Sequence, residues 1–384
     1  MAELRIPFFR PAIDEEDVAA VAETLRSGWL TSGPNVREFE RELAAYTGAR
    51  FVNAVNSCTA ALHLCLRAWG IGPGDEVVVP VYTFSATATV VVHTGARPVL
   101  ADVRESDANL DPEAFERAIT PRTRAVIPVH FAGEPCDMDA ILAIARAKGI
   151  RVLEDAAHAI GSRYRGRMVG TIGDATAFSF YATKNMTTGE GGALATDDEE
   201  LSERVRVLTL HGMTKDAWNR YDAGGSWRYD IVEFGFKDNL TDLAAALGRR
   251  QLAKLEQLTE ARTRAAMRYF ANLRDEPLLR LPAFDAANRH AWHLFVVRLD
   301  TERSPVGRDE VIRQLAARGI GTSVHFIPLH YHSAYRRLGW QPGDFPVAER
   351  IFEGAISLPL FPSMTDAEVD AVCEALREIL HPRG

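Results

Sequence analysis

The hydrophobic positions of the chain follow two spacings, one typical of helices and one typical of buried strands. Short apolar runs rich in β-branched residues recur between residues 76 and 197, and runs of this length predict strands that are buried on both faces. They are EVVVP (76–80), RPVLADV (97–103), RAVIPVHF (124–131), RVLED (151–155), ATAFSFY (175–181) and GGALATD (191–197). Most are separated by helical or loop stretches, and this βαβ order predicts an α/β fold with a mostly parallel sheet.

Helical spacing predicts two helices before the first of these strands. Asp14 is placed to cap the first helix, and Gly28 is placed to end it. The second helix follows the loop TSGP and ends at Gly48. Apolar residues share one face in each helix; they are Val18, Val21 and Leu25 in the first and Val36, Phe39 and Leu43 in the second.

The pattern beyond the strands predicts a second domain, which the length of 384 residues also favours because single cores rarely exceed roughly 250–300 residues. A helical pattern from Asp242 past Phe270 predicts a long helix that bridges the domains. After it come a strand, a helix, a strand and a last helix, which are HLFVVRLD (293–300), RDEVIRQLAARG (308–319), TSVHF (322–326) and the segment opened by a Thr365–Glu368 capping box. We therefore predict a large domain over residues 1–255 and a smaller α+β domain over residues 256–384.

Composition and charge narrow the class of protein. A chain with 47% hydrophobic and 25% charged residues has the usage of a folded globular protein, which argues against a disordered or fibrous one. The net charge is −8 and the basic residues form no long run, so nucleic acid is not an expected partner. The four cysteines form no CxxC pair, the N-terminus lacks the apolar stretch of a secretory signal, and no apolar run has the length of a membrane span. We expect a cytoplasmic protein that does not bind membranes.

The densest group of chemically useful residues lies between residues 153 and 198. Asp155 ends an apolar strand, Lys184 follows another, and Ser179 lies five positions before Lys184. Ligands of parallel sheets gather at the carboxyl ends of the strands, so we expect these side chains to converge. Each has an ordinary explanation alone, as a helix cap, a solvated lysine or a turn residue. Together they suit pyridoxal phosphate, because an amine can bind its aldehyde, a carboxylate its pyridine nitrogen and a hydroxyl its phosphate.

Two earlier stretches add candidates for the same site. In NSCTAALHLCL (56–66), Ser57 and Thr59 precede a helical pattern whose first N–H groups suit a phosphate, with a plain helix cap as the alternative. In VPVYTFSATA (79–88), Tyr82 and Phe84 follow an apolar strand, where an aromatic ring either stacks on a flat ligand or fills the core.

The order and spacing of these stretches resemble the DegT-type nucleotide-sugar aminotransferases, which have the aspartate-aminotransferase fold (fold type I). The resemblance covers nearly the whole chain, and it implies pyridoxal phosphate as the cofactor. The motifs that carry it are SGWLTSGPNVREFE, SCTAALHL, VPVYTFSATA, PVHFAGEPCDMD, EDAAHAIG, SFYATKN with GEGGAL, the HG pair at 211–212, GFKDNLTDLAAALG, SVHFIPLH and SLPL. The signatures G-x-G-x-x-G, G-x-S-x-G and H-E-x-x-H, which mark other enzyme classes, are absent from the sequence.

The resemblance also implies roles for individual residues. Lys184 would bind the cofactor covalently, and Asp155 would pair with its pyridine nitrogen. The other cofactor contacts that it implies are Ser179, Ser57, Cys58 and Thr59 at the phosphate, Phe84 on the ring face and His158 near the ring oxygen. Asn239, with Lys237 as the second choice, would reach the cofactor phosphate of the neighbouring subunit, which implies a homodimer with shared active sites. Because this chain has Ser-Cys-Thr where the family usually has Ser-Gly-Thr, a need for positive φ at Cys58 stays open.

The substrate side is predicted from the same resemblance. The residues on that side are His325, His330, Tyr331 and Trp29. Arg228 and Arg220, in a polar loop ahead of GFKDN, are candidates to bind the diphosphate through charge-assisted hydrogen bonds. A metal is the alternative for the histidines around residue 330, but no cysteine or carboxylate completes a ligand set nearby, so we expect no metal. Ordinary packing is the alternative for the two aromatic residues, and a solvated surface position is the alternative for Arg228 and Arg220.

The predicted activity is transfer of an amino group from an amino acid, with glutamate favoured, to a keto sugar of a nucleoside diphosphate. A 4-keto-6-deoxyhexose aminated at C4 is the favoured substrate, and amination at C3 is the alternative. A keto-cyclitol aminotransferase would share the same cofactor motifs. Lys184 argues against the sugar dehydratases of this family, which have histidine there, and the complete set of lysine, aspartate and serine argues against a non-catalytic regulator on the same fold.

Overall fold

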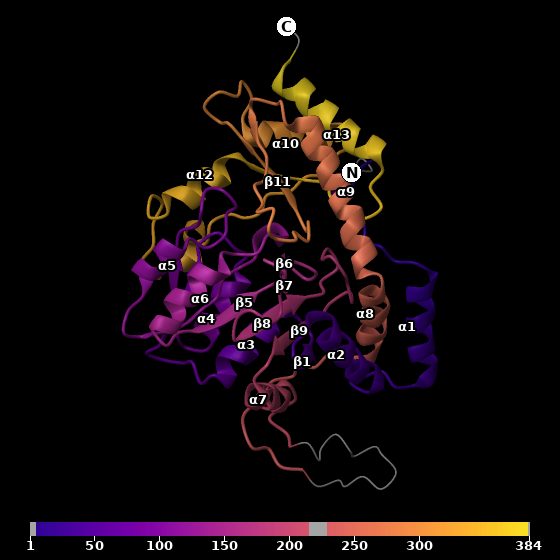
Figure 1. Cartoon of the computed structure of the whole chain (residues 1–384), viewed down its shortest axis with the longest axis vertical. Helices are drawn as coiled ribbons and strands as arrows, with labels where there is room; N and C mark the ends of the chain where they lie inside the picture. Colours follow the sequence, from indigo (N-terminus) through magenta and orange to yellow (C-terminus); the bar gives the residue numbers. More distant parts are fainter. Residues whose placement is uncertain (1–4, 215–228, 383–384) are drawn as a thin grey trace.

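The computed structural model describes residues 5–214 and 229–382 (Figure 1). A seven-stranded sheet with the order β1-β9-β8-β5-β4-β2-β3 forms the centre of the larger part. Its strands are β1 (Phe51–Val55), β2 (Glu76–Pro80), β3 (Arg97–Ala101), β4 (Thr123–Val126), β5 (Arg151–Asp155), β8 (Ala175–Ser179) and β9 (Gly192–Thr196). In this sheet β9 is the strand that runs antiparallel to its neighbours, so the prediction of a mostly parallel sheet is confirmed.

Helices cover both faces of the central sheet (Figure 1). Val152 and Leu153 are successive residues of β5 and therefore point to opposite faces. Val152 belongs to one buried cluster with Phe39, and Leu153 belongs to another with Leu62. This two-sided burial explains why the strand sequences are apolar throughout. The helices of this part are α1 (Glu15–Ser27), α2 (Pro34–Thr47), α3 (Cys58–Ala68), α4 (Ala86–His93), α5 (Pro112–Ala118), α6 (Met138–Ala147), α7 (Glu199–Thr209) and α8 (Asp242–Ala253), and a small hairpin is formed by β6 (Arg163–Tyr164) and β7 (Arg167–Met168).

The two N-terminal helices begin and end as predicted, but they bury different kinds of face. Asp14 forms a capping box at the start of α1, and Gly28 and Gly48 end α1 and α2 in the left-handed conformation. The predicted apolar face of α2 is buried. In α1 the predicted face is not buried, since Val18 and Leu25 are 53% and 54% exposed. The reason is that α1 packs on α8 through polar contacts of its other face. Gln251 of α8 and Lys254 at its C-cap both donate hydrogen bonds to the buried Asp17.

The long helix predicted from Asp242 is interrupted in the structure. It consists of α8 and α9 (Leu255–Leu273), and the break falls at Lys254, which has φ −108° and ψ 5°. The Lys254 amine lies 2.5 Å from carboxylate oxygens of both Asp14 and Asp17 at the start of α1. The helical spacing of apolar residues continues on both sides of Lys254, so the sequence pattern did not predict the break. In Figure 1, α9 runs from the sheet region into the C-terminal part, as expected for a bridge.

The C-terminal part has a three-stranded antiparallel sheet of β10 (Leu279–Arg280), β11 (Phe295–Leu299) and β12 (Ala355–Leu358). The helices α10 (Arg308–Ala317) and α13 (Asp366–Leu380) contribute to its core together with α9, and the capping box of α13 is present. Two shorter helices are α11 (Ser333–Arg336) and α12 (Pro346–Gly354). Ile6, from the N-terminal region, belongs to this core and forms a bridge with Ile320. The domain boundary near residue 255 stays a prediction. Along the described residues, no helix combines the length and the apolar character needed to cross a bilayer.

The strand predicted at TSVHF (322–326) does not form, so that prediction was wrong. Ser323 makes one bridge to Ser357 of β12, and the following residues leave the sheet. The His325 ring bonds the Ser357 hydroxyl at 2.8 Å, and the His325 carbonyl accepts a hydrogen bond from Tyr82 at 2.6 Å. The Ser357 contact keeps the segment beside β12, and the Tyr82 contact attaches it to the larger part of the molecule.

Candidate active site

A pocket of about 470 Å³ opens at the carboxyl ends of the central strands. Asp155 enters it from the end of β5, and Ser179 and Lys184 enter it from the end of β8 and the loop that follows. The N-terminus of α3 forms a second wall, and His325 of the C-terminal part forms a third. The three residues predicted to converge therefore lie in one pocket, where a doubly wound sheet binds its ligands.

Asp155 is a buried carboxylate held in a fixed orientation. One of its oxygens accepts a hydrogen bond from the Thr87 hydroxyl at 2.8 Å, and the other accepts one from the Ala157 N–H at 3.2 Å. Burial raises the pKa of Asp155 above its usual value, although these two hydrogen bonds and the charge of Lys184 oppose the rise. A cation that enters the pocket would therefore stabilise the ionised form of Asp155.

Lys184 provides the amine of the pocket. Its backbone N–H is bonded to the Tyr181 carbonyl at 2.9 Å, which anchors the loop that carries it. Burial lowers the pKa of the Lys184 amine to about 8, against the attraction of Cys58 and Asp155. Within the described ranges the amine has no hydrogen bond or ion pair. A lysine of this kind keeps a substantial neutral fraction near neutral pH, and the neutral amine is the form that attacks an aldehyde.

The start of α3, at Ser57, Cys58 and Thr59, presents backbone N–H groups of the kind that suit an anion, and we refer to it as the cradle. The Ser57 hydroxyl accepts from the Ala60 N–H at 3.1 Å, so it acts as the helix cap that was the alternative for this residue. Cys58 begins α3 with ordinary helical backbone, so no positive φ is needed where the family usually has glycine. A side chain at Gly192 would lie 2.4 Å from the Cys58 amide nitrogen, so only glycine lets β9 approach the cradle this closely.

Three further predicted residues border the cradle and the opening of the pocket. Thr59 and Ser179 line the pocket, and the Ser179 hydroxyl accepts a hydrogen bond from the Tyr181 N–H at 3.4 Å. Phe84 also lines it and is 63% exposed, with its ring 6.1 Å from that of Phe326. An aromatic ring that is this exposed at a pocket is available to stack on a flat ligand.

Imidazoles make up much of the wall opposite the cradle. His158 is buried, and its Nδ1 accepts from the Ala132 N–H at 3.3 Å, which leaves Nε2 as the nitrogen that carries hydrogen. Burial lowers the pKa of His158 well below its usual value, and the charge of Lys184 adds to this. Burial likewise lowers the pKa of His325 to about 4. The wall is therefore neutral at physiological pH.

Several predicted substrate residues do not reach this pocket within one chain. His330 is fully buried and bonds Glu349 through Nε2 at 2.8 Å, and Tyr331 packs against Phe352 beside it. Trp29 lines a different pocket between α1, α2 and α8. Arg228, like Arg220, lies outside the described residues. Among the described residues, no group of three histidine, cysteine or acidic side chains is placed to hold a metal ion.

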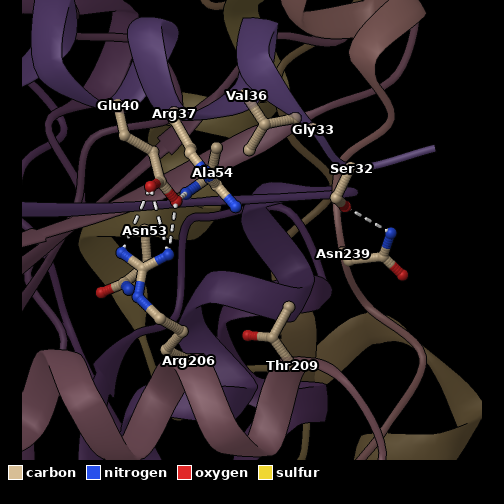
Figure 2. Close-up of a pocket in the computed structure, with 10 residues that line it drawn as sticks. All are labelled: Ser32, Gly33, Val36, Arg37, Glu40, Asn53, Ala54, Arg206, Thr209 and Asn239. Atoms are coloured by element: carbon tan, nitrogen blue, oxygen red, sulfur yellow. Dashed lines mark hydrogen bonds and ion pairs between the residues drawn. The ribbon is translucent and has the colours of Figure 1, made fainter. Parts of the chain in front are cut away.

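Asn239 lies in a separate pocket of about 340 Å³ beside α2 (Figure 2). Its amide donates to the Ser32 hydroxyl at 2.7 Å. Figure 2 also shows the ion pair between Glu40 of α2 and Arg206 of α7 on the other side of this pocket. Within a single chain, Asn239 is therefore absent from the lining of the Lys184 pocket.

The sequence patterns missed three residues that the structure places in the Lys184 pocket. Thr87 bonds Asp155, while His293 and Phe326 line the wall around His158. Thr87 lies within VPVYTFSATA, and Phe326 lies within the segment expected to be a strand, so their motifs were noted without their roles. His293 precedes an apolar strand and carries no pattern of its own.

The described residues fit pyridoxal phosphate. The unpaired amine of Lys184 matches its aldehyde, the buried carboxylate of Asp155 matches a protonated pyridine nitrogen, and the cradle kept open by Gly192 matches its phosphate. This sheet topology and this site define a pyridoxal-phosphate-dependent enzyme of fold type I.

Comparisons with known proteins identify the family. Residues 11–377 match the DegT/DnrJ/EryC1/StrS aminotransferase family, so the chain belongs to that family and is a pyridoxal-phosphate-dependent aminotransferase. It is 53% identical over 377 residues to the spore coat polysaccharide biosynthesis protein SpsC of Bacillus subtilis, a match that covers 98% of this chain and 97% of SpsC.

Solved structures agree with this membership. Spr1654 of Streptococcus pneumoniae, described as a candidate sugar aminotransferase and solved in its PMP form, is 38% identical with a TM-score of 0.92, and the match covers 98% of this chain and 99% of that chain. DesV of S. venezuelae, solved in complex with a ketimine intermediate, is 39% identical with a TM-score of 0.91, over 99% of this chain and all of that chain (100%). The predicted fold, enzyme class and cofactor are confirmed.

Proposed function

We propose that this aminotransferase moves an amino group from glutamate to a keto sugar carried on a nucleoside diphosphate, with a 4-keto-6-deoxyhexose aminated at C4 as the favoured substrate. The observation that carries the proposal is the joining of Lys184, Asp155 and the α3 cradle in one pocket of a chain from this family. Similarity to SpsC, named for polysaccharide biosynthesis, and to Spr1654 supports a sugar as the acceptor.

The residues of the pocket divide the work of the reaction. Bound pyridoxal phosphate supplies an electron-accepting ring that makes the hydrogen on the amine-bearing carbon acidic. Asp155, oriented by Thr87, holds the proton on the pyridine nitrogen. Lys184 takes the proton from the substrate carbon and returns it as the amino group is transferred. The N–H groups of Cys58 and Thr59 and the hydroxyl of Ser179 bind the phosphate.

The phosphate site also explains why we propose a homodimer with shared active sites. Asn239 does not line the Lys184 pocket of its own chain, so in this proposal it reaches the phosphate of the second subunit. Apolar residues that are exposed in one chain support a second copy: Phe234 is 92% exposed, Val232 59% and Val18 53%. The four free cysteines are all buried, which supports the reducing cytoplasm as the location.

Mixed dimers test the shared site. Lys184→Ala and Asn239→Ala variants are each expected to have very low activity, because each spoils both sites of its own dimer. A hybrid of the two holds one site with an intact lysine and an intact asparagine, so mixing and re-forming the dimers should recover activity that neither parent has. A fully active protein that sediments as a monomer would contradict the proposal.

The acceptor is tested with a panel of keto-sugar nucleotides and a keto-cyclitol, with glutamate as donor. Nuclear magnetic resonance of the product reads which carbon carries the new amino group. We expect turnover of the nucleotide-linked sugar with nitrogen at C4. Nitrogen at C3 would replace the favoured position, and turnover of the cyclitol alone would overturn the nucleotide-sugar substrate while the cofactor chemistry stands.

A further inference from the structure

His293 lies in the pocket of Lys184 but has no role in the reaction described so far. It precedes β11, is only 6% exposed, and its ring centre lies 4.4 Å from that of His158. Its backbone N–H is bonded to the Ala132 carbonyl at 2.9 Å, which fixes its position. Its Nδ1 is buried and has no hydrogen-bond partner among the described residues. Nε2 also has no hydrogen-bond partner among the described residues, but unlike Nδ1 it is not fully enclosed, so it is the nitrogen of this pocket-lining residue that is available to a ligand.

The surroundings of His293 determine which nitrogen carries the hydrogen. Burial, His158 and Lys184 lower the pKa of His293 well below its usual value, so the ring is neutral and has one N–H. A buried N–H without a partner is less common in proteins than a buried lone pair without one. The hydrogen therefore belongs on Nε2, and the ring offers a neutral donor to the pocket.

We propose that His293 is a substrate-binding residue whose Nε2–H donates a hydrogen bond to the oxygen on the carbon next to the one that exchanges the amino group. Both substrates of the proposed function, on which this inference rests, have such an oxygen. In the amino acid it belongs to the carboxylate, and in the keto sugar it is the hydroxyl of the neighbouring carbon. Since the two substrates occupy the pocket in turn, one donor can serve both.

The composition of the pocket supports this assignment. Among the described residues that line it, there is no arginine, which is the residue that most often binds a carboxylate in a bidentate manner. Among these described lining residues, the donors available to a carboxylate are neutral groups and Lys184. His293 is such a donor, and its Nε2–H has no hydrogen-bond partner among the described residues, so an oxygen of the substrate would satisfy it.

Two substitutions separate hydrogen bonding from packing. His293→Phe keeps an aromatic ring beside His158 but removes the donor, whereas His293→Gln keeps an N–H donor and removes the ring. If His293 binds substrate, the Phe variant should lose about 10- to 100-fold in kcat/KM in both half-reactions, and the Gln variant should retain most of the activity. The amino-acid half-reaction is followed by the change in cofactor absorbance with glutamate, and the other half with the keto-sugar nucleotide.

A binding measurement and a control make the test independent of turnover. Calorimetric titration of the cofactor-loaded enzyme with glutarate, an unreactive dicarboxylate, should show weaker binding in the Phe variant by a similar factor. His63→Phe makes the same change at a half-buried imidazole that packs on Phe236 outside the pocket, and it should leave both half-reactions unchanged.

Three results would overturn the proposal. They are unchanged kinetics in the Phe variant, a Gln variant as impaired as the Phe variant, and a loss confined to one half-reaction. If the wild-type enzyme accepts no keto sugar, the proposed acceptor fails, but the glutamate half-reaction and glutarate binding still test His293.

Discussion

Glu154 and Asp155 are neighbouring residues of β5, and their buried carboxylates lie on opposite faces of the sheet in different surroundings. On the face away from the pocket, Glu154 accepts from His130 Nε2 at 2.9 Å, the Gly173 N–H at 2.7 Å and the Thr176 hydroxyl at 2.8 Å. Burial would raise the pKa of Glu154, but these bonds, led by that of His130, hold it below its usual value. Asp155, on the pocket face, accepts from the Thr87 hydroxyl, the Ala157 N–H and, at 3.8 Å, the weak donor Cys58 Sγ, and its pKa is raised by burial.

The difference teaches that burial alone does not identify a functional carboxylate. Glu154 is fully buried and its charge is met by the protein, so it belongs to the structure. Asp155 is buried nearly as deeply, but part of the stabilisation of its charge is left to a group that binds later. Replacing residues on each face should therefore change different properties, catalysis on one face and stability on the other.

The largest effect is expected from Lys184→Ala, which should abolish turnover while the protein stays folded. The amine lies on the pocket face without a partner among the described residues, so its loss removes chemistry and little packing. Borohydride reduction followed by mass spectrometry should no longer attach the cofactor to the chain. A variant that still transaminates at near wild-type rate would show that Lys184 is not the catalytic amine.

The next largest effect is expected from Asp155→Asn, which should bind cofactor but lose about 10²- to 10³-fold in turnover. An amide cannot hold a proton on the pyridine nitrogen as a carboxylate does, and removing one positioned electrostatic partner has a cost of this order. Steady-state kinetics at saturating cofactor measures it. Unchanged turnover would mean that another group supplies the negative charge.

On the opposite face, Glu154→Gln should lower the free energy of unfolding by about 1–3 kcal/mol. The new amide NH₂ would face either the N–H of His130, whose Nδ1 accepts from the Cys136 N–H at 3.0 Å, or the N–H of Gly173 on the other side, so a donor would oppose a donor in both orientations. Denaturant unfolding of the two proteins measures the difference. Kinetic constants that fall as far as those of Asp155→Asn would remove the contrast between the faces.

The sign of the pH dependence sharpens that prediction. Because folding lowers the pKa of Glu154, its contribution to stability is complete above the unfolded pKa of about 4.5 and is lost as the pH falls through the folded pKa. The stability difference between wild type and Glu154→Gln should therefore shrink in acid. A difference that grows below pH 4.5 would contradict the assignment.

The smallest effect is a shift in rate with pH. Capture of the cofactor by the cofactor-free protein requires the neutral Lys184 amine, whose pKa is lowered to about 8. The rate at which the bound-cofactor absorbance appears should rise with pH up to about 8 and then level off. A rate that keeps rising toward pH 10 would indicate a lysine with an ordinary pKa.

The contrast between the faces of β5 also explains how far the sequence could predict this molecule. Apolar runs locate most strands because burial on both sides leaves few polar positions, and strand ends then locate Asp155 and Lys184. The same patterns do not predict contacts between segments that are distant in the sequence. Thr87 reaches Asp155 from another element, and TSVHF leaves the small sheet because Tyr82, far away in sequence, bonds its backbone.

The sequence patterns also did not predict the polar contacts between helices. The break at Lys254 depends on two aspartates at the start of α1, and the exposed apolar face of α1 follows from the same polar packing. Asn239 shows a limit of a different kind. Its predicted partner is on another chain, so neither the pattern of one sequence nor the pocket of one subunit contains it.

The pairing of Ile6 with Ile320 has a consequence for the order in which the chain folds during synthesis. Ile6 emerges from the ribosome early, but the core that it joins is made of residues from the last third of the chain. The central sheet can assemble first, since its strands lie between residues 51 and 196, while the leading segment waits for its partner. Closure of the C-terminal part is thus a late and long-range event, and a bulky fusion placed before Ile6 should slow that step more than assembly of the sheet.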